Sequence, residues 1–518
     1  MFINPSSHSA SAILTYMKSE TNIGGRIADL RESQGFTQSD LAKKIKSTQS
    51  AVARMESGRQ NVSAEMLAKI SKALGKNLVT LSPGTMNLQI EGGHKLSGTV
   101  VTNTSKNGAV VLLCAALLNK GQTTIHKMPR IEEVYRLTEV LESIGVKIEW
   151  TGSTLTLTPP KKYDLKGIDI ASAKRTRSIV MFIGPLIHHM KKFALPQSGG
   201  CKLGSRTVRP HFFALEHFGV DIDVTEDAYK VSYEAKKPKE IILYESGDTV
   251  TENALLGAAL SPGATTIKYC SANYMVQELC TFLEAVGVQI DGIGTTTLTV
   301  HGIEEINQNI EYTLSEDPTD SMFFIAAAIT THSKITIERC PIEFLELELL
   351  VLEKMGLKYK KIKPYISHNG RTKLVDLTIM PSKLTASLEK IHSRPYPGIN
   401  ADNLPFFAVI ATQATGQTLI HDWMYEKRAI YFTELDKLGG ETVLADPHRI
   451  YITGPSDLRA TELVCPPALR PSTILLIAML GAKGTSILRN IYSINRGYEK
   501  LVERLTELGA KVDYLEEF

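Results

Sequence analysis

The first patterned stretch of the chain, residues 22–81, has apolar positions at helical spacing in short runs. Ile23, Ile27 and Leu30 lie three to four residues apart, as on one face of a helix, and a glycine follows the run. Short helices joined by tight turns are typical of a helix-turn-helix unit. We therefore expect a small all-α domain over residues 22–81, after a Ser- and Thr-rich flexible tail at residues 1–21.

Further helices of this module can be placed from their ends. Thr37 stands three residues before Asp40, a spacing typical of a capping box at the start of a helix. A second helix is predicted over residues 49–56, and a third carries the apolar positions of residues 66–74. A proline and a glycine then end the helical pattern, so residues 82–84 are expected to form a linker.

Beyond residue 85, one phrase recurs six times in the chain. It reads leucine, acid, any residue, apolar, glycine, apolar, with looser copies in the last two cases, and each copy lies between a helical and a strand-like pattern. Its glycines are Gly145, Gly219, Gly287, Gly356, Gly439 and Gly509, which lie 74, 68, 69, 83 and 70 residues apart. Glycine is a sensible terminator at a helix end. Six such units, each mixing helices and strands, predict two α/β domains of three units each.

A second phrase runs in step with the first. Alanine-rich helical stretches begin at Ala115, Ala258, Ala326 and Ala478, and each leads through a turn into a strand-like segment. Small residues allow such helices to pack closely. A period this long excludes short solenoid repeats and favours repetition of one α/β folding unit.

The composition is that of an ordinary globular protein. The chain has 518 residues, of which 43% are hydrophobic and 22% are charged, and its formal net charge is +3. This length predicts two or three domains, and the net charge gives no bulk signal for a nucleic-acid or membrane surface. Six cysteines without regular spacing argue against a disulfide scaffold and favour a reducing compartment.

The sequence carries no membrane or export signal. No run approaches the roughly 18 apolar residues that span a bilayer, and the N-terminus lacks a basic region followed by an apolar core. We therefore expect a cytoplasmic protein without membrane contact. We also expect no metal site and no bound cofactor.

One loop carries a candidate for chemistry. Gly199 and Gly200 place Cys201 on a turn where no side chain screens the thiol, and Lys202 and Arg206 add positive charge nearby. Cations beside a cysteine favour the thiolate and attract anions. Cys201 is therefore a candidate nucleophile or general acid, and a surface cysteine beside a basic loop is the alternative.

The helical module resembles the Cro-type helix-turn-helix DNA-binding family. The resemblance rests on residues 36–42, on Gln49 and Ser50, and on residues 54–58. It implies that Gln49 and Ser50 begin a recognition helix facing the DNA major groove, that Gln38 lies near a phosphate, and that the module pairs as a dimer. A helical bundle kept only for protein contacts is the alternative.

Residues 85–518 resemble the enolpyruvyl transferase family. The resemblance rests on the sixfold repeat and on the Gly-Gly-Cys loop in the second unit. It implies two inside-out α/β domains that face each other across a cleft. By the family's layout, one domain combines residues 85–105 with residues 316–518, and the other covers residues 106–315.

The same resemblance assigns roles to residues in separate motifs. The implied catalytic residues are Cys201, Asp402 and Lys106. The implied phosphoenolpyruvate-binding residues are Lys106, Arg206, Arg470 and Arg496. The implied acceptor-binding residues are Asn107, Arg177, Arg206, Asp402 and Arg428. Cys201 would protonate the methylene carbon or form a transient adduct, and Asp402 would take the proton of the acceptor hydroxyl.

Cations from distant parts of the chain suit this substrate. Phosphoenolpyruvate is small and highly anionic, so a partly dry cleft needs several cations on rigid elements to bind it. The four residues implied to bind it come from widely separated units, which suits a cleft between domains.

The sequence leaves two features open. Asp317 matches the aspartate of the shikimate-phosphate members of the family, whereas an ungapped match to the sugar-nucleotide members selects Glu316. Glu245 and Asp248 stand where the sugar-nucleotide members have a lysine and part of the turn that lines the uridine. Because carboxylates repel a diphosphate, we expect weaker binding of UDP-N-acetylglucosamine than is usual in the family.

Two functions of different classes follow from these observations. The first is transfer of the enolpyruvyl group of phosphoenolpyruvate to a hydroxyl of UDP-N-acetylglucosamine or a related acceptor, with release of phosphate, as in peptidoglycan precursor synthesis. The alternative is a DNA-binding transcriptional regulator whose enzyme-like domain senses a metabolite without turnover. Phosphate release in the presence of phosphoenolpyruvate and candidate acceptors separates the two.

Overall fold

The structure is a computed structural model, and it divides the chain into two compact units, residues 1–85 and 86–518. It describes residues 27–28, 31–32, 36–45, 47–56, 66, 69–70, 73, 86–197 and 207–515. The predicted tail, Ile23 and the linker at residues 82–84 lie outside the described residues.

The N-terminal unit contains helices at the predicted places. Helix α3 spans Gln38–Lys44 and helix α4 spans Gln49–Glu56. The predicted capping box at the start of α3 is confirmed, because the backbone N–H of Asp40 donates to Thr37 Oγ1 at 3.2 Å and that of Thr37 donates to Asp40 Oδ2 at 3.0 Å. The buried apolar residues of the unit are Ile27, Leu41, Ala42, Ile45, Val52, Met55 and Ile70.

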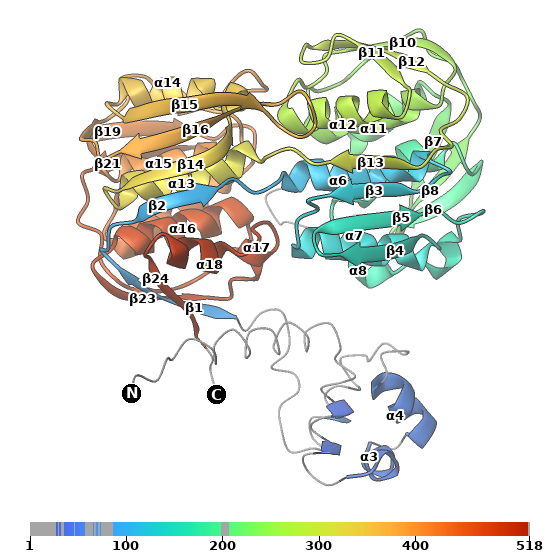
Figure 1. The fold of residues 1–518 in the computed structure, drawn as a ribbon, viewed down its shortest axis with the longest axis horizontal. Coiled ribbons are helices and arrows are strands. Elements are labelled where there is room, and N and C mark those ends of the chain that lie inside the picture. The colour runs from blue at the N-terminus through green and yellow to red at the C-terminus, as the bar shows by residue number, and fades with distance from the viewer. Residues whose placement is uncertain are drawn as a thin grey trace. The chain divides into compact units, whose positions relative to one another are not determined.

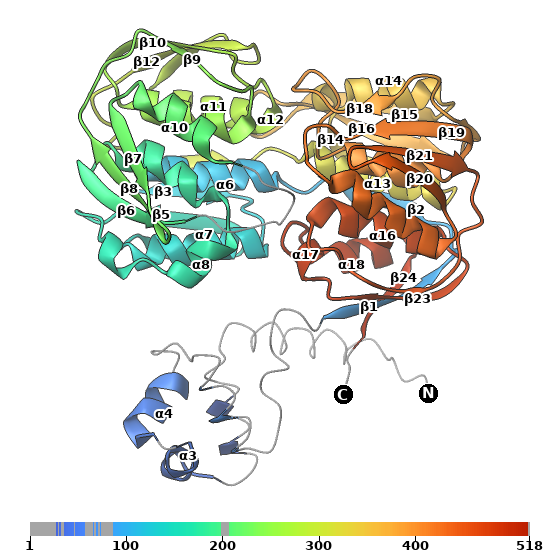
Figure 2. The same ribbon diagram turned by 180° about the vertical axis from the view of Figure 1, so that it is seen from behind.

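The large unit consists of two lobes with separate hydrophobic cores (Figures 1 and 2). We call the part before Asn103 and after Glu316 the terminal lobe, and the part between these residues the central lobe. The core of the terminal lobe joins residues 88–100 to residues 322–512, whereas nearly all of the second core comes from residues 109–314. The chain therefore leaves the terminal lobe, builds the central lobe, and returns.

Three sheets form the outside of the terminal lobe. The first has the order β22 (Glu462–Val464), β23 (Gly484–Arg489), β1 (Asn87–Gly92), β24 (Lys511–Leu515). The second has the order β15 (Lys358–Ile366), β16 (Lys373–Met380), β14 (Lys334–Pro341), β2 (Ser97–Val101). The third has the order β17 (Leu384–Thr385), β19 (Ala414–His421), β21 (Arg449–Gly454), β20 (Glu441–Asp446), with β18 (Ile391–His392) also paired to β19.

The central lobe repeats this arrangement with three further sheets. The first has the order β13 (Ile310–Thr313), β3 (Thr123–His126), β5 (Thr154–Thr158), β4 (Lys147–Thr151). The second has the order β11 (Gln289–Asp291), β12 (Thr297–Gly302), β10 (Gly263–Lys268), β9 (Glu240–Ile242). The third has the order β6 (Lys192–Pro196), β8 (Ala228–Tyr233), β7 (Val220–Val224).

Each lobe encloses helices that are buried over most or all of their length. These are α6 (Lys106–Ala115), α9 (Ile183–Leu186), α11 (Asp248–Ala259), α13 (Pro318–Thr330), α15 (Leu404–Ala411) and α16 (Leu469–Gly481). All 13 residues of α13 are buried, as expected for a helix without a polar face. The prediction of two inside-out α/β domains is confirmed, because the sheets lie outside and the most hydrophobic helices inside.

Other helices lie between the inner helices and the sheets or at the lobe surface. They are α7 (Glu132–Ser143), α8 (Ile170–Arg175), α10 (Arg209–Glu216), α12 (Tyr274–Ala285), α14 (Glu346–Lys354), α17 (Tyr492–Asn495) and α18 (Leu501–Glu507). The short 3-10 turns are η2 (Ala116–Leu118), η3 (Leu165–Gly167), η4 (Ser178–Phe182), η5 (Ile342–Phe344) and η6 (Arg428–Leu438).

The six glycines of the repeated phrase end helices, as predicted. Each has a positive φ, between 88° and 105°, and each follows one of the helices α7, α10, α12, α14, η6 and α18. A strand begins one to two residues later in every case. Since this backbone conformation is costly for other residues, the glycines account for the regular helix-to-strand transition of the fold.

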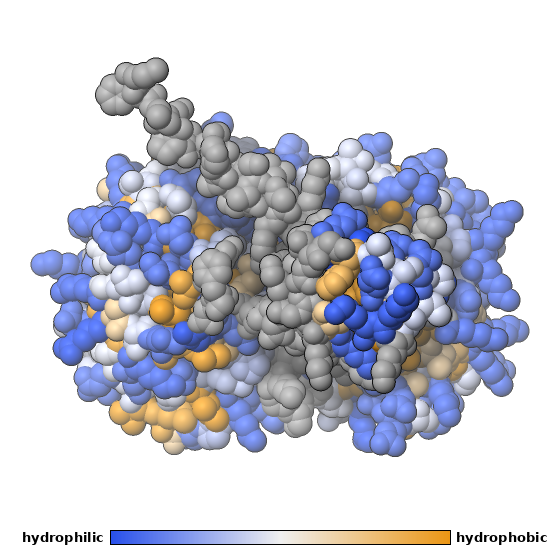
Figure 3. All heavy atoms as spheres, turned by 90° about the horizontal axis from the view of Figure 1, so that it is seen from below, coloured by the Kyte–Doolittle hydropathy of each residue, from blue (hydrophilic) through white to orange (hydrophobic). Residues whose placement is uncertain are grey.

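Among the described residues, no helix is both long and apolar enough to cross a bilayer. On the face seen in Figure 3, hydrophilic residues predominate among the coloured atoms, and hydrophobic ones lie in small groups. This mixture is ordinary for a folded protein surface.

Candidate active site

A pocket lies where the two lobes meet. Its lining includes Lys106 from the central lobe and Asp317, Arg470 and Tyr498 from the terminal lobe. Lys106 is the first residue of α6, Asp317 caps α13, and Arg470 lies in the first turn of α16. Three helix N-termini therefore approach the pocket, and each adds partial positive charge.

Lys106 is fixed by the start of its helix. Ser105 caps α6 by accepting the N–H of Gly108 at 2.8 Å, and the backbone N–H of Lys106 donates to Asp317 Oδ2 at 3.2 Å. Burial lowers the pKa of the Lys106 ammonium, and the carboxylates of Glu133 and Asp402 oppose this effect. Within residues 86–197 and 207–515, no carboxylate pairs directly with the Lys106 ammonium.

Arg470 is buried and anchored at two points. Nη1 donates to Tyr498 Oη at 2.7 Å, and Nη2 donates to Asp402 Oδ2 at 3.2 Å. Its Nε–H is buried without a hydrogen-bond partner among the described residues. Burial opposes the charged form, but Tyr498, Asp402 and Asp317 raise the pKa, so Arg470 stays cationic. A guanidinium has five N–H donors, so donors remain for an anion in the pocket.

Asp402 is the acidic group whose charge the neighbouring cations stabilise. Its side chain is 24% exposed, and its backbone N–H donates to Asn400 Oδ1 at 2.8 Å. Burial would raise the pKa of Asp402, but Arg470, Arg428 and Lys106 outweigh it and lower the pKa below the ordinary value. Asp402 is therefore an ionised carboxylate that can accept a proton.

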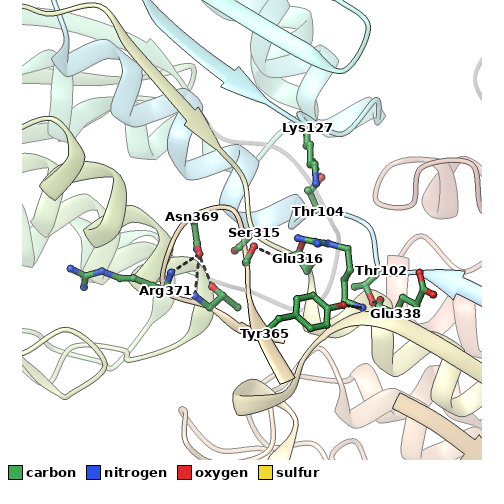
Figure 4. Close-up of polar contacts among 12 residues, drawn as sticks. Thr102, Thr104, Lys127, Ser315, Glu316, Glu338, Tyr365, Asn369 and Arg371 are labelled. Carbon is green, nitrogen blue, oxygen red and sulfur yellow. Dashed lines mark hydrogen bonds and ion pairs between the residues drawn. The ribbon is translucent and has the colours of Figure 1, made fainter. Parts of the chain in front are cut away.

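The structure separates the two acids that the sequence left open. Glu316 pairs with Arg339, whose Nε lies 2.7 Å from Oε1, and accepts from Ser367 Oγ at 2.6 Å (Figure 4). Asp317 lines the pocket and accepts the N–H groups of Thr319 at 2.8 Å and of Lys106. Successive side chains of an extended segment point to opposite sides, so neighbouring acids reach different environments.

Arg496 crosses from the terminal lobe to the central lobe. Its Nε donates to Glu133 Oε2 at 2.6 Å, and Thr176 donates to the other oxygen of the same carboxylate at 2.8 Å. Glu133 is only 4% exposed, and the cations Lys106 and Arg496 outweigh burial and lower its pKa. An anion that binds Arg496 would share it with this carboxylate.

Three of the predicted acceptor-binding residues have partners in different parts of the large unit. Asn107 Nδ2 donates to the hydroxyl of Tyr274 at 3.1 Å. The charges of Asp317, Asp402 and Arg470 act on this tyrosine, so Asn107 lies close to the same site. Arg177 Nη2 donates to the carbonyl of Thr207 at 2.9 Å, directly after the residues that the structure does not describe. Arg428 is 1% exposed, and its guanidinium is held by the carboxylate of Asp422.

Arg428 influences the site through the backbone. Its Nη2 donates to the carbonyl of Ala401 at 2.7 Å, and Ala401 precedes Asp402. The ring of Tyr425 lies 4.0 Å from the guanidinium carbon, which completes the enclosure. The guanidinium therefore supports the Asp402 segment.

Asp248 lies at the start of α11, where neighbouring side chains hold its carboxylate. It accepts hydrogen bonds from Ser271 Oγ at 2.6 Å and from Asn273 Nδ2 at 3.3 Å. The expected repulsion of a diphosphate by Glu245 and Asp248 stays a prediction.

The comparison with protein families agrees with this geometry. Residues 90–505 match the model described as EPSP synthase (3-phosphoshikimate 1-carboxyvinyltransferase), which spans both lobes. The chain belongs to the EPSP synthase family. A second model, described as helix-turn-helix, matches residues 27–81.

Curated relatives within the EPSP synthase family match most of the chain. UDP-N-acetylglucosamine 1-carboxyvinyltransferase of Bradyrhizobium diazoefficiens is 32% identical over 433 residues, which cover 82% of this chain and 96% of the relative. The protein of the same name from Treponema denticola is 31% identical over 427 residues, covering 82% and 99%.

Solved structures show the same fold. The enolpyruvyl transferase NikO from Streptomyces tendae superposes with a TM-score of 0.71 at 24% identity, covering 84% of this chain and 99% of that chain. EPSP synthase from Acinetobacter baumannii gives a TM-score of 0.63 at 17% identity, covering 83% and 100%. At these identities the likeness concerns the fold alone.

For the EPSP synthase family site, the structure brings together Lys106, Asp402, Arg470 and Asn107. Cys201 and Arg206 lie outside the described residues, so their predicted roles stay predictions. Residues that the sequence reasoning did not assign are Tyr274, Tyr498, Glu133 and Glu348. An acid or tyrosine on a helix has many ordinary explanations in a sequence, and only its three-dimensional partners reveal its place.

The residues predicted to face DNA form a chain of side-chain hydrogen bonds. Gln49 Nε2 donates to Gln38 Oε1 at 2.8 Å, and Gln38 Nε2 donates to Glu56 Oε2 at 2.8 Å. Glu56 is itself paired with the buried Arg31 at 2.6 Å. Gln49 and its neighbour Ser50 are exposed at the start of α4. The chain of hydrogen bonds fixes the direction of the Gln49 amide.

Proposed function

We propose that this protein transfers the enolpyruvyl group of phosphoenolpyruvate to a hydroxyl of UDP-N-acetylglucosamine or a related acceptor. The observation that carries the proposal is the pocket between the lobes, which is lined by Lys106, Arg470 and Asp317, with Asp402 hydrogen-bonded to Arg470. Its cations suit the phosphate and carboxylate of the donor, and its acids suit proton transfer. The names of the curated relatives support the choice of acceptor.

The proposed reaction has three proton transfers. The acceptor oxygen attacks C2 of phosphoenolpyruvate while its proton passes to Asp402, and the methylene carbon takes a proton from the Cys201 thiol. The C2–O bond to phosphate then breaks, and one methyl proton returns to the Cys201 thiolate, which restores the double bond. Lys106 and Arg470 stabilise the charge that develops on the phosphate.

Asp317 is the better candidate of the two open acids. It lies in the pocket beside the Lys106 backbone, whereas Glu316 is bound to Arg339 and Ser367. Burial raises the pKa of Asp317, and Arg470 opposes that effect. We assign to Asp317 the role of orienting the reacting groups, with Asp402 as the base.

The experiment is a phosphate-release assay with phosphoenolpyruvate and a panel of acceptors. The panel contains UDP-N-acetylglucosamine, other nucleotides and shikimate 3-phosphate. We expect acceptor-dependent phosphate release with at least one member, and its loss in Asp402→Asn and Cys201→Ser. Absence of turnover with the whole panel, together with phosphoenolpyruvate binding, would favour the sensing function instead.

The acceptor choice has its own test. We expect UDP-N-acetylglucosamine to bind more weakly than is usual in the family, because Glu245 adds negative charge near the predicted diphosphate position. Calorimetry of Glu245→Lys should show tighter binding. Unchanged affinity in this variant would place Glu245 outside the acceptor site.

A second function, DNA binding, is favoured by the N-terminal unit. Its support is the match of residues 27–81 to a helix-turn-helix model and the exposed, oriented Gln49. We propose that Gln49 and Ser50 contact base edges and that Gln38 approaches a phosphate. Dimerisation would place two such units on paired half-sites.

Band shifts of the full chain on a pool of duplexes test this second function. Binding should fall steeply as salt rises, because phosphate contacts release counterions. Gln49→Ala should weaken binding to a selected site while leaving the unit folded, since Gln49 is exposed. If no duplex shifts at low salt, the unit is a protein-contact domain.

A further inference from the structure

The segment that carries Asp402 is a tight turn before α15, and hydrogen bonds hold it on both sides. Asn403 caps α15, and the N–H groups of Asn403 and Leu404 donate to the carbonyl of Asn400 at 2.9 Å and 3.1 Å. The N–H of Asp402 donates to the side chain of Asn400, and Arg428 holds the carbonyl before it. The position of the Asp402 carboxylate therefore depends on how firmly this turn is held.

One buried carboxylate closes the turn from the side of α14. Glu348 Oε1 accepts the backbone N–H of Asn400 at 3.0 Å and the side-chain Nδ2 of Asn403 at 2.9 Å. These two donors stand three residues apart, with Asp402 between them. A single oxygen atom thus connects the beginning of the turn to its end.

The orientation of Glu348 is unusual for its helix. The other acids of α14, Glu346 and Glu353, are exposed, whereas Glu348 is only 2% exposed and lies beside the buried Leu349. Burial raises the pKa of Glu348, and the hydrogen bonds from Asn403 and Asn400 oppose that effect. An apolar side chain would avoid the desolvation of a carboxylate at this position, so packing alone does not explain an acid here.

We propose that Glu348 is a positioning residue that fixes the Asp402 carboxylate against Arg470, a residue that lines the pocket. The proposal rests on the proposed function of Asp402 as the base. Glu348 does not line the pocket and acts on chemistry only through the turn. On the other side of the turn, Arg428 holds the carbonyl of Ala401, so Asp402 is supported from two elements.

This role predicts a particular separation of kinetic effects. A small displacement of a catalytic group lowers the rate of the chemical step more than it lowers substrate affinity. The phosphoenolpyruvate contacts proposed for Lys106 and Arg470 do not involve Glu348. Loss of the Glu348 carboxyl should therefore lower kcat and leave the phosphoenolpyruvate dissociation constant unchanged.

The experiment compares three variants of the full chain. Glu348→Leu removes both acceptor bonds, Glu348→Gln keeps an oxygen that can accept them, and Glu346→Ala removes an exposed acid from the same helix. We expect Glu348→Leu to lower kcat by about 10- to 100-fold with an unchanged dissociation constant for phosphoenolpyruvate. Glu348→Gln and Glu346→Ala should stay within about threefold of the wild type.

A second readout does not depend on turnover. Amide hydrogen exchange at Asn400 and Asp402 should accelerate in Glu348→Leu and stay at the wild-type rate in Glu346→Ala. An active wild type whose Glu348→Leu variant keeps full kcat would overturn the proposal, as would parallel losses of kcat and phosphoenolpyruvate affinity. An inactive wild type would refute the proposed function, and unchanged exchange in Glu348→Leu would then overturn the positioning role.

Discussion

The two walls of the pocket differ in how their charges are held. On the terminal lobe, Arg470 is bound to Asp402 and Tyr498, and the neighbouring Asp320 is bound by Arg504 at 2.8 Å and 2.7 Å. On the central lobe, no carboxylate pairs directly with the Lys106 ammonium among the described residues, and burial lowers its pKa. The terminal wall is therefore charge-balanced before substrate arrives, whereas the central wall offers a cation that the substrate can satisfy.

This difference separates stability from binding. Removing one member of a buried ion pair leaves its partner uncompensated and destabilises the fold. Removing a buried cation without a direct partner carries no such penalty, but it removes attraction for an anionic ligand. Substitutions in the two walls should therefore fail in different assays.

The largest effect is expected at Arg470. Arg470→Ala would leave Asp402 and Asp317 without their nearest cation, so we expect the unfolding free energy to fall by about 3–5 kcal/mol. Urea denaturation of the full chain measures it, with the exposed Arg459→Ala as the matched control. A variant as stable as the control would show that the Arg470 network does not support the terminal wall.

Lys106→Ala should give the opposite pattern. We expect phosphoenolpyruvate affinity to fall by about 100-fold or more, because a desolvated charge contact is lost. The unfolding free energy should stay unchanged or rise, since the buried cation opposes folding. Calorimetry and denaturation are compared with Lys120→Ala, an exposed lysine of the same lobe that pairs with Glu305. A stability loss as large as that of Arg470→Ala would remove the distinction between the walls.

The pH dependence of phosphoenolpyruvate binding should report the Lys106 ammonium. Burial lowers the folded pKa of Lys106 below its ordinary value of 10.5, so the cation is lost at a lower pH than that of an exposed lysine. Affinity should therefore decline at a lower pH than an ordinary lysine would give. Lys106→Arg, which stays charged, should move the decline to higher pH. Identical profiles in both proteins would assign the decline to another group.

A smaller effect is expected outside both walls. The loop between β15 and β16 carries Asn369 and Arg371 (Figure 4). It reaches the central lobe, where Arg371 pairs with Glu284 and Asn369 donates to Glu278 at 3.1 Å. Arg371 is 49% exposed, so its pair should contribute less than about 1 kcal/mol. Arg371→Ala should change both stability and turnover only slightly. A large loss of turnover at unchanged stability would indicate that this loop controls the lobe arrangement.

The sequence predicted the features of the fold that depend on local chemistry. The six repeated glycines end helices because glycine tolerates a positive φ, and this requirement is visible in a single sequence. Helices α9 and α15 lack the alanine-rich phrase, and α15 instead carries the apolar run Leu404–Ala411. The alanine-rich phrase occurs in four copies, so it predicted fewer inner helices than the described residues contain.

The sequence predicted the site less completely than the fold, because contacts between distant parts of the chain decide the surroundings of several site residues. Asp317 and Glu316 are adjacent, and they differ only because Arg339 and Ser367 approach Glu316 from elsewhere in the fold. Arg428 carries the expected motif, yet its guanidinium is occupied by Asp422, six residues earlier. Such partners leave no periodic signal, so residue type and spacing could not reveal them.

A crystal structure of the full chain with bound phosphoenolpyruvate tests the comparison of the two walls most directly. The account predicts that the Lys106 ammonium contacts an oxygen of the ligand, while Arg470 keeps its bonds to Asp402 and Tyr498 and binds the ligand through its remaining N–H groups. A ligand bound away from Lys106, or an Arg470 that abandons Asp402 to reach it, would contradict this division of roles.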